Sequence, residues 1–362
     1  MKTKWTKRML ATLLCGAMMA GLAACGSSST DTAADDGTAG NDAAADSTGA
    51  VVTINVGYEN ATTEPAAQAA EKWKELVEEK SGGSIQLELF PNSTLGKKND
   101  LIDQMLMGEN VITVADGAFL ADYGVPDFGI FYAPYTFESW DELWAVLDSD
   151  WYADLCDKLA STGGLRVLTS NWIYGARDIL SIKEVHTPSD LSGLKLRVSS
   201  NDLSVRSFED LGATPVGMDM GDVYQAMSGG TIDAVENPIT SLYNRSFQEV
   251  AKYLTKNEHI LATSMWICGE SFFTTLTEEQ QQILMECADE AGLYNNELYD
   301  AATEEAEQGM KDAGVTVIEL TDDEKAQWVE AAQKFFDEAS STLGWTEGLY
   351  DTVKGISTGA AA

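Results

Sequence analysis

The sequence predicts an α/β fold in two lobes, with a long helix spanning both. The first apolar segments alternate between strand and helix periodicity, and this alternation is typical of a parallel sheet with helices on its faces. Residues 51–362 are numerous enough to build two lobes. Helical spacing then continues from Thr277 to Lys311, which is unusually long for one small domain and predicts a helix that bridges two lobes.

The N-terminus has the pattern of a targeting segment. An apolar run from Met9 to Leu22 follows four basic residues and is too short to span a membrane stably. It ends in Leu22-Ala23-Ala24-Cys25, which resembles the lipobox of a bacterial lipoprotein signal. Residues 1–24 are therefore predicted to be a signal peptide, and the Cys25 sulfur is predicted to carry a diacylglyceryl group. The alternative is an ordinary secretory signal that leaves Cys25 as a free thiol.

A polar segment follows the lipobox. Residues 26–50 contain no aromatic residue and no Leu, Ile or Val, so they bury too little apolar surface to offset their ordering entropy. We expect residues 25–50 to be a flexible, lipid-anchored linker. Acyl chains on Cys25 would hold the protein to the cell membrane, in the periplasm or on the outer face.

The first folded segment contains three strands and two helices. Strands are predicted at 51–57, 85–89 and 111–115, where apolar residues alternate with polar ones or form a short buried run. A helix with an apolar stripe is predicted at 64–80 and a second at 97–107, which ends before Gly108.

The later elements alternate in the same manner. Helices are predicted at 139–147, 150–161, 203–211, 219–227 and 322–339, and strands at 165–170, 176–181, 194–198, 231–235, 266–275 and 315–318. In open α/β sheets ligands lie beyond the carboxyl ends of the strands. Arg197 is near the end of its predicted strand and Asn237 follows the end of another, so both are predicted cleft residues.

The formal net charge of −35 argues against nucleic acid or an anionic membrane surface as a partner. After the signal segment, arginine occurs only between Arg166 and Arg245. The planar guanidinium matches a carboxylate through two hydrogen bonds, so an anion site in this region is one interpretation. On the distribution of arginine alone, surface ion pairs with the many acidic residues are the favoured interpretation.

The sequence gives no pattern typical of an enzyme. His186 and His259 lie in neither an H-E-x-x-H nor a triad-like setting, and no G-x-S-x-G motif, P-loop or metal-ligand cluster occurs. We therefore predict no catalysis, no metal and no cofactor. Cys156, Cys268 and Cys287 are predicted to be buried apolar thiols, and a Cys268–Cys287 disulfide remains the alternative.

Five segments of the sequence carry recognisable motifs. They are FPNSTLG at 90–96, APYTF at 133–137, YGAR at 174–177, LSGLKLRV at 191–198 and LGATPVGMDMGDVYQAMSGGTIDAVENP at 211–238. Together, and in this order, they resemble the DctP family, the substrate-binding proteins of tripartite ATP-independent periplasmic (TRAP) transporters. The resemblance implies a two-lobe periplasmic-binding-protein-like fold with a ligand cleft between the lobes. It also implies that the chain crosses between lobes near residues 173, 262 and 303. The first lobe is then 51–173 with 263–302, and the second is 174–262 with 303–362.

The resemblance also implies the carboxylate site. Arg197 would pair with the ligand carboxylate, Arg177 would assist, and Asn237 would hydrogen-bond the same group. Weaker candidate contacts lie at positions that the family uses, and for each of them a structural role is the favoured interpretation. Among them, Asp116 would favour a hydroxylated or partly cationic part of the ligand. These positions are Asn60, Asp116, Tyr123, Trp172, Met218 and Met220.

The implied function is the capture of a small organic acid anion for a TRAP membrane permease. The ligand would be a C4-dicarboxylate, a uronate or a related sugar acid, and the aromatic residues near Arg177 favour a sugar acid. A ligand-sensing lipoprotein that signals to a receptor is the alternative.

Overall fold

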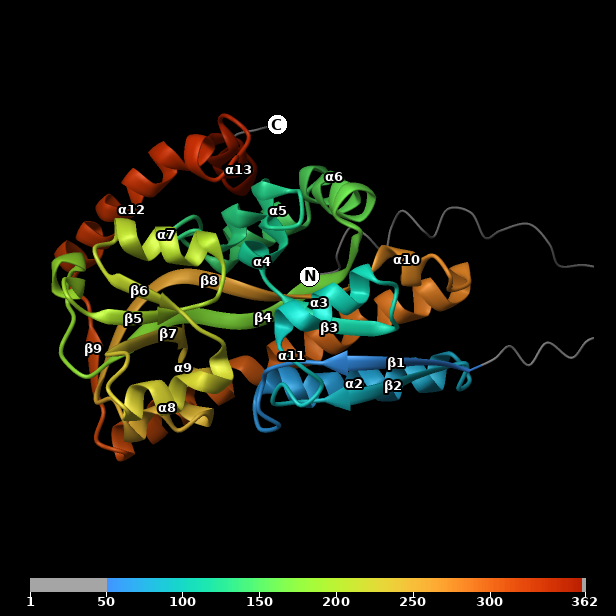
Figure 1. Cartoon of the computed structure of the whole chain (residues 1–362), viewed down its shortest axis with the longest axis horizontal. Helices are drawn as coiled ribbons and strands as arrows, with labels where there is room; N and C mark the ends of the chain where they lie inside the picture. Colours follow the sequence, from blue (N-terminus) through green and yellow to red (C-terminus); the bar gives the residue numbers. More distant parts are fainter. Residues whose placement is uncertain (1–50, 360–362) are drawn as a thin grey trace, which may run out of the picture. The chain divides into compact units, whose positions relative to one another are not determined.

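Nine strands in residues 51–359, the part of the 362-residue chain that this computed structural model describes, form one mixed sheet (Figure 1). The predicted signal peptide, Cys25 and the linker lie outside the described residues. The strand order is β2-β1-β3-β8-β4-β7-β5-β6, and β9 pairs with β8. The strands are β1 Val52–Gly57, β2 Ile85–Phe90, β3 Val111–Ala115, β4 Leu165–Ser181, β5 Lys195–Val198, β6 Thr214–Gly217, β7 Ala234–Pro238, β8 Tyr253–Gly269 and β9 Thr316–Glu319.

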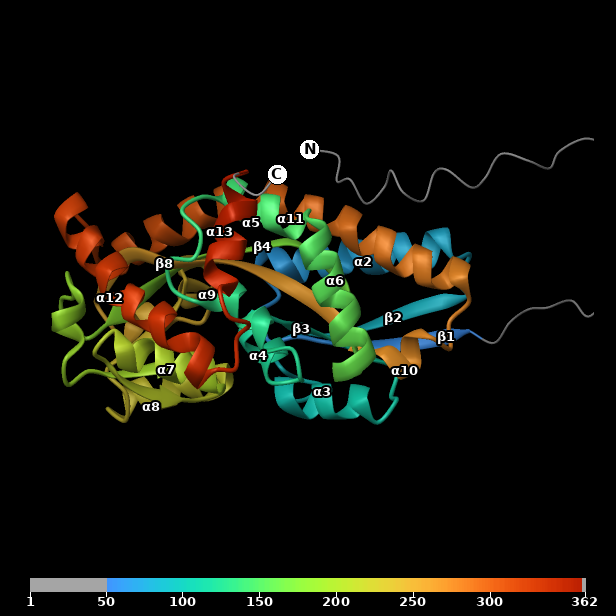
Figure 2. The same ribbon diagram turned by 90° about the horizontal axis from the view of Figure 1, so that it is seen from above.

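Helices cover the sheet on both faces (Figures 1 and 2). The α-helices are α2 Pro65–Lys80, α3 Lys98–Leu106, α4 Gly117–Ala121, α5 Trp140–Leu147, α6 Asp150–Lys158, α7 Asp202–Asp210, α8 Val223–Ser228, α9 Ile239–Asn244, α10 Glu270–Phe273, α11 Glu278–Asp312, α12 Asp322–Thr342 and α13 Leu349–Ser357. Short 3-10 or π turns are η2 Pro126–Tyr132, η3 Leu159–Gly163, η4 Pro188–Leu191, η5 Met220–Asp222 and η6 Phe247–Glu249.

The sheet has two halves that share two long strands. In the first half β1 lies parallel to both β2 and β3, and in the second half β5 lies parallel to both β6 and β7. The antiparallel pair β4 and β8 runs through both halves, because β3 pairs with one end of β8 while β7 pairs with the far end of β4. The two halves are therefore joined by continuous strands.

Each half has its own apolar layers. In the first half, α2 and α11 cover one face around Trp73, Trp172 and Trp266, and α3, α4 and η2 cover the other. In the second half, α8, α9 and the end of α11 cover one face, while α7 and α12 cover the opposite face. Because α11 packs against α2 in one half and α9 in the other, it spans both halves (Figure 2).

Hydrogen bonds join the middle of α11 to β4 at the point where the pairing of β4 with β8 is irregular. Register shifts occur on both sides of Ile173. The Asn296 side chain accepts from the Ile173 backbone N–H at 2.7 Å, and the Asn295 amide donates to the Ile173 carbonyl at 2.9 Å. Side chains of α11 thus satisfy backbone groups of β4 beside the irregular pairing, as buried polar groups require.

The parallel opening and the long helix are confirmed by the structure, whereas several predicted elements differ from it in extent. Segments 165–170 and 176–181 belong to one strand, β4, because bulges and Gly175 interrupt the pattern without ending the strand. Strand β7 begins and ends about three residues later than predicted, so Asn237 lies inside it. The strand expected at 266–275 is β8, which begins at Tyr253, and its predicted end forms α10. Helix α13 was not predicted.

Two further features bear on the sequence predictions. In the region 51–359, no helix is both long and apolar enough to cross a membrane. Cys156, Cys268 and Cys287 are free thiols, and the last two are fully buried. The Cys268–Cys287 disulfide is therefore absent from the described residues, and the predicted buried apolar thiols are found at both positions.

Candidate functional site

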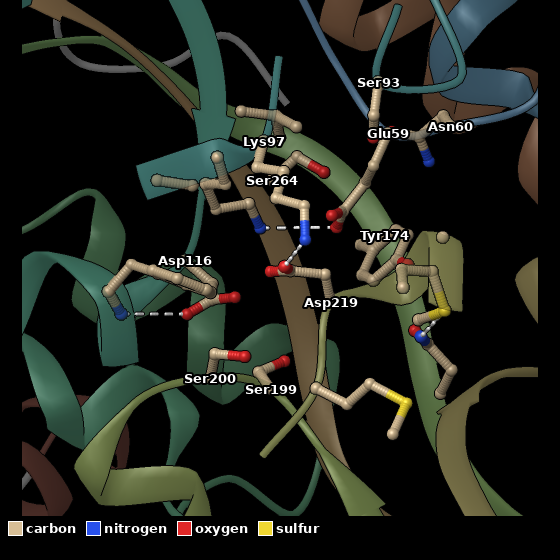
Figure 3. Close-up of a pocket in the computed structure, with 18 of the residues that line it drawn as sticks. Glu59, Asn60, Ser93, Lys97, Asp116, Tyr174, Ser199, Ser200, Asp219 and Ser264 are labelled. Atoms are coloured by element: carbon tan, nitrogen blue, oxygen red, sulfur yellow. Dashed lines mark hydrogen bonds and ion pairs between the residues drawn. The ribbon is translucent and has the colours of Figure 1, made fainter. Parts of the chain in front are cut away.

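A pocket of about 190 Å³ lies where the carboxyl ends of strands from both sheet halves meet. Residues that follow β1 and β3 line it from the first half, and residues in or after β5, β6 and β7 line it from the second. Figure 3 shows Glu59 and Asn60 on one side and Ser199 and Ser200 across from them. This is the location expected for a ligand site in an open α/β sheet.

Arg197 lies in the pocket wall with most of its hydrogen-bonding capacity unused. Strand β5 places it there, and its side chain is 3 % exposed. Its Nε donates to the Met218 carbonyl at 2.8 Å, which fixes the guanidinium plane. Within the described residues its Nη1 has no hydrogen-bond partner and no carboxylate forms an ion pair with it. Burial lowers the pKa of Arg197, although the nearby Glu236 and Glu59 carboxylates oppose that shift.

Arg177 also lines the pocket, but it is already paired with a carboxylate. Its Nε lies 2.6 Å from Oε2 of Glu236, and its Nη2 lies 2.8 Å from Oε1 of the same residue. Burial alone would raise the pKa of Glu236, but Arg177 and His259 lower it to about 2. Two of the three guanidinium nitrogens of Arg177 are therefore occupied by this ion pair.

Asn237 is the third predicted carboxylate contact, and it lines the pocket from β7. Its amide nitrogen has only a weak contact, at 3.8 Å, with the Met220 sulfur. Its amide oxygen is buried and has no hydrogen-bond partner among residues 51–359. Met218 and Met220 line the same wall, as predicted, and they give the pocket part of its apolar surface.

An ion pair that the sequence did not predict stands on the opposite wall. Lys98 Nζ lies 3.3 Å from Glu59 Oε1 and 4.3 Å from the centre of the Phe119 ring. The two charged side chains are 13 % and 26 % exposed. Burial acts to raise the pKa of Glu59, but Lys98, Arg245 and Arg197 outweigh it, so that pKa lies below its usual value. Glu59 is therefore an ionised hydrogen-bond acceptor facing the pocket.

Two more predicted residues lie on this wall. Asp116 caps α4, where one carboxylate oxygen accepts from the backbone N–H groups of Ala118 and Phe119 at 3.0 and 3.2 Å. Burial raises its pKa, and Lys98 offsets part of that effect. The Asn60 amide donates to Glu64 at 2.9 Å, so its nitrogen is partly committed to the end of α2. Both side chains line the pocket.

A second lysine joins the two halves of the sheet at the pocket. Lys97 precedes α3, and its Nζ lies 2.6 Å from Asp219 and 3.5 Å from Asp222, which follow β6 (Figure 3). Lys97 is 57 % exposed, so the pair lies at the solvent side. The contact connects elements from opposite sides of the pocket.

The structure places two predicted contacts elsewhere, and these two predictions are corrected. Trp172 is 0 % exposed, packs edge-on against Trp73 and Trp266, and donates its indole N–H to the Ala288 carbonyl. It belongs to the core because its side chain points toward α11. Tyr123 packs at the edge of the other core layer and is outside the pocket lining.

The charges around the pocket decide what it can bind. Lys98 pairs with Glu59, Lys97 with Asp219, and Arg177 with Glu236. Of the four basic residues that line the pocket, Arg197 is the one without an acidic partner in the described structure. Residues 51–359 hold no cluster of three or more His, Cys, Asp or Glu side chains suited to a metal ion. The arrangement therefore supports binding of one anionic group at Arg197. The carboxylates that line the rest of the pocket can accept hydrogen bonds from hydroxyl groups.

Comparison with known proteins agrees with this geometry. Residues 56–342 match the DctP family, described as bacterial extracellular solute-binding protein, family 7. The chain is 33 % identical over 270 residues to the 2,3-diketo-L-gulonate-binding periplasmic protein YiaO of Escherichia coli, a match that covers 74 % of this chain and 81 % of YiaO. It is 29 % identical to the C4-dicarboxylate-binding periplasmic protein DctP of Rhodobacter capsulatus, over 81 % of this chain and 88 % of that protein.

Solved structures show the same fold. A TRAP periplasmic solute-binding protein from Ochrobacterium anthropi with bound L-fuconate has a TM-score of 0.80 and 39 % identity, covering 85 % of this chain and 100 % of that chain. One from Actinobacillus succinogenes with bound L-galactonate has a TM-score of 0.80 and 35 % identity, with the same coverage. The resemblance found in the sequence motifs and the predicted two-lobe fold are thus confirmed. This chain belongs to the DctP family of extracellular solute-binding proteins of TRAP transporters.

Proposed function

We propose that the protein captures a sugar acid with a single carboxylate, an aldonate or a uronate, and delivers it to a TRAP permease. The observation that carries the proposal is the buried guanidinium of Arg197, whose Nη1 has no partner within residues 51–359 and which lines the pocket. A ligand carboxylate would accept from Arg197, while the Asn237 amide would complete its hydrogen bonds. Hydrogen bonds to charged groups contribute about 1.5–3 kcal/mol each.

The other wall of the pocket suits hydroxyl groups. Glu59 is an ionised acceptor, Lys98 is a donor beside it, and Asp116 and Asn60 add further polar atoms. A second ligand carboxylate would meet Glu59 and Asp116 there, whereas hydroxyl groups can donate to both. This charge arrangement favours a polyhydroxylated monocarboxylate over a C4-dicarboxylate.

Relatives support the same ligand class. The two structural matches reported above, at 39 % and 35 % identity, contain bound L-fuconate and L-galactonate. YiaO is named for another sugar acid, 2,3-diketo-L-gulonate. DctP of R. capsulatus is named for C4-dicarboxylates, so that class remains the second candidate. Neither relative described above is named as a sensor, so the ligand-sensing alternative receives no support from them.

The remaining parts of the proposal concern delivery. The two lobes, 51–173 with 263–302 and 174–262 with 303–362, would close over the ligand, since the pocket draws residues from both. The permease would then bind the closed form. Lipid on Cys25 would keep the protein at the cell membrane. The work is binding rather than catalysis, because family members are substrate-binding transport proteins.

A ligand panel tests the proposal. The protein from residue 26 onward, which removes the predicted lipid site, would be screened by thermal shift against aldonates, uronates, C4-dicarboxylates and keto acids. A ligand present at 100 times its Kd adds about 2.7 kcal/mol to the stability. We expect the largest shifts from sugar acids, with affinities then measured by calorimetry. Larger shifts with succinate or malate would reject the sugar-acid assignment in favour of dicarboxylates.

A further inference from the structure

Tyr132 has a buried hydroxyl with no hydrogen-bond partner in the part of the chain that the structure describes. The residue ends η2, is 3 % exposed and lines the pocket. A buried polar group without a partner costs about 1–3 kcal/mol, and such groups are rare in folded proteins. An unused donor inside a binding pocket is therefore a candidate ligand contact.

The neighbours of Tyr132 indicate that its hydroxyl lies near the arginines that would bind the ligand carboxylate. Its ring packs on Arg177, with 4.9 Å from the guanidinium carbon to the ring centre. Tyr132 lies close enough to Arg197 to act on the pKa of that guanidinium, which also lines the pocket. Ser199, which follows β5, lies near enough to the hydroxyl to lower the pKa of Tyr132 through hydrogen bonding, but no hydrogen bond of ordinary length and angle joins the two side chains. The Tyr132 hydroxyl thus shares the region of the pocket in which Arg197 has an unused N–H.

The hydroxyl is also in the right protonation state to donate. Burial raises the pKa of Tyr132 well above its usual value, and Arg177 offsets only part of this shift. The hydroxyl therefore keeps its proton at neutral pH. In contrast, Arg177 uses its Nε and Nη2 for Glu236. A ligand carboxylate that reaches Arg197 finds a free donor in Tyr132 and a largely occupied one in Arg177.

We propose that Tyr132 is a ligand-positioning residue that donates its hydroxyl hydrogen bond to the carboxylate held by Arg197. Arg177 then acts mainly as a support on which the Tyr132 ring packs. This inference rests on the proposed function, because it needs an acid in the pocket. It adds a contact that neither the sequence motifs nor the predicted site included.

The test is Tyr132→Phe, which removes one oxygen and keeps the ring. Calorimetry with L-galactonate, and with the acid that gives the largest thermal shift in the panel, would measure the change in Kd. We expect affinity to fall about tenfold to a hundredfold, the equivalent of one hydrogen bond to a charged group. The unliganded variant should unfold at the same temperature as the wild type or higher, because an unsatisfied buried hydroxyl has been removed.

Tyr135→Phe is the matched control. Tyr135 lies three residues further on, outside the pocket lining, and its hydroxyl donates to the Asn257 carbonyl at 3.0 Å. Its loss should lower the unfolding temperature and leave ligand affinity unchanged, which is the opposite pattern to Tyr132→Phe. If Tyr132 had only a structural role, Tyr132→Phe would behave like Tyr135→Phe, with a lower unfolding temperature and unchanged ligand affinity.

The outcomes separate the two claims. If the wild type binds a sugar acid and Tyr132→Phe binds it equally well, Tyr132 is not a ligand contact, and a hydrogen bond to Ser199 is the better assignment. If the wild type binds none of the acids tested, the proposed function fails and this inference fails with it. Selective loss of affinity in Tyr132→Phe supports both.

Discussion

Arg177 and Glu236 form a buried, bidentate ion pair between β4 and β7, with nitrogen–oxygen distances of 2.6 and 2.8 Å. The two side chains are 3 % and 1 % exposed. His259 approaches the same carboxylate, at 3.4 Å, from β8. Arg177, Glu236 and His259 therefore link β4, β7 and β8 at the wall of the pocket.

Removal of the negative partner should destabilise the fold. Glu236→Gln leaves the Arg177 charge buried without compensation, and breaking a buried pair costs about 3–5 kcal/mol. Urea denaturation would measure the free energy of unfolding. Lys325→Gln is the control, since it removes an exposed ion pair with Glu258 and should change stability by less than about 1 kcal/mol. Equal effects of the two substitutions would contradict the buried-pair assignment.

Asp178 gives a pH dependence of opposite sign to that of a salt-bridged acid. Burial raises the pKa of Asp178 from 3.8 to about 8. The hydrogen bond that the Glu258 backbone N–H donates to the carboxylate opposes this shift. Between these two values the folded state binds a proton that the unfolded state has released. The stability from Asp178 is therefore complete below about pH 4 and is lost as the pH rises through 8.

Asp178→Asn should remove this term, because the amide resembles the protonated acid. We expect the variant to gain stability relative to the wild type as the pH rises from 5 to 8, measured by thermal unfolding at several pH values. A difference that is constant from pH 5 to 8 would show that Asp178 is ionised throughout, and a difference that shrinks toward pH 8 would also contradict the raised pKa.

Gly292 should be needed for the contact between α11 and β4. A Cβ at this position would lie 1.9 Å from the Asn171 Oδ1 and 2.6 Å from the Trp172 indole. Gly292→Ala should therefore lower the unfolding free energy by about 1–3 kcal/mol through overpacking. Without this clash, alanine in a helix would stabilise the protein by about 1 kcal/mol relative to glycine. The sign of the stability change therefore shows whether the close packing is present.

A glycine with room for a side chain provides the comparison. In Gly217→Ala the nearest atoms to the new Cβ would be 3.7 Å away, so we expect little change in stability by the same denaturation experiment. A stabilised Gly292→Ala protein would mean that α11 and β4 are less closely packed than the structure shows.

Lys97 should have a small, salt-dependent effect on affinity. Its pair with Asp219 joins the two sides of the pocket, but both side chains are well exposed, and such pairs contribute about 0.2–1 kcal/mol. Lys97→Gln should weaken sugar-acid binding by less than about fivefold and should reduce the dependence of Kd on salt. Lys334→Gln, which removes a comparable exposed pair with Asp210, should leave Kd unchanged. A loss above about fiftyfold would instead place Lys97 in direct contact with the ligand.

The parts of the fold that depend on local pattern could be predicted from the sequence. Alternating and helical periodicity gave the β1-α2-β2-α3-β3 opening and the bridging helix α11. Strand β8 was only partly predicted, since its first half contains Lys256, Asn257 and Glu258, which do not read as a buried strand. Pairing with β4 and β9 on its two sides, rather than its own pattern, makes this segment a strand.

The site could be predicted only where a residue follows a recognisable motif. Motifs singled out Arg197 and Asn237, which line the pocket, but they did not reveal the partner of Arg177. Glu236 meets Arg177 only through the pairing of β4 with β7. Lys98 was overlooked although a signal exists. A lysine at the start of α3 opposes the helix dipole, and such a conflict often marks a binding residue.

The central claim is that Arg197 holds the ligand carboxylate, and calorimetry on Arg197→Lys tests it most directly. Lysine keeps the charge and loses the planar fork, so we expect Kd for a sugar acid to rise at least tenfold, consistent with a cost of about 2–5 kcal/mol. Arg206→Lys, on the exposed side of α7, should bind as the wild type does. Equal affinity of Arg197→Lys and the wild type would contradict the assignment.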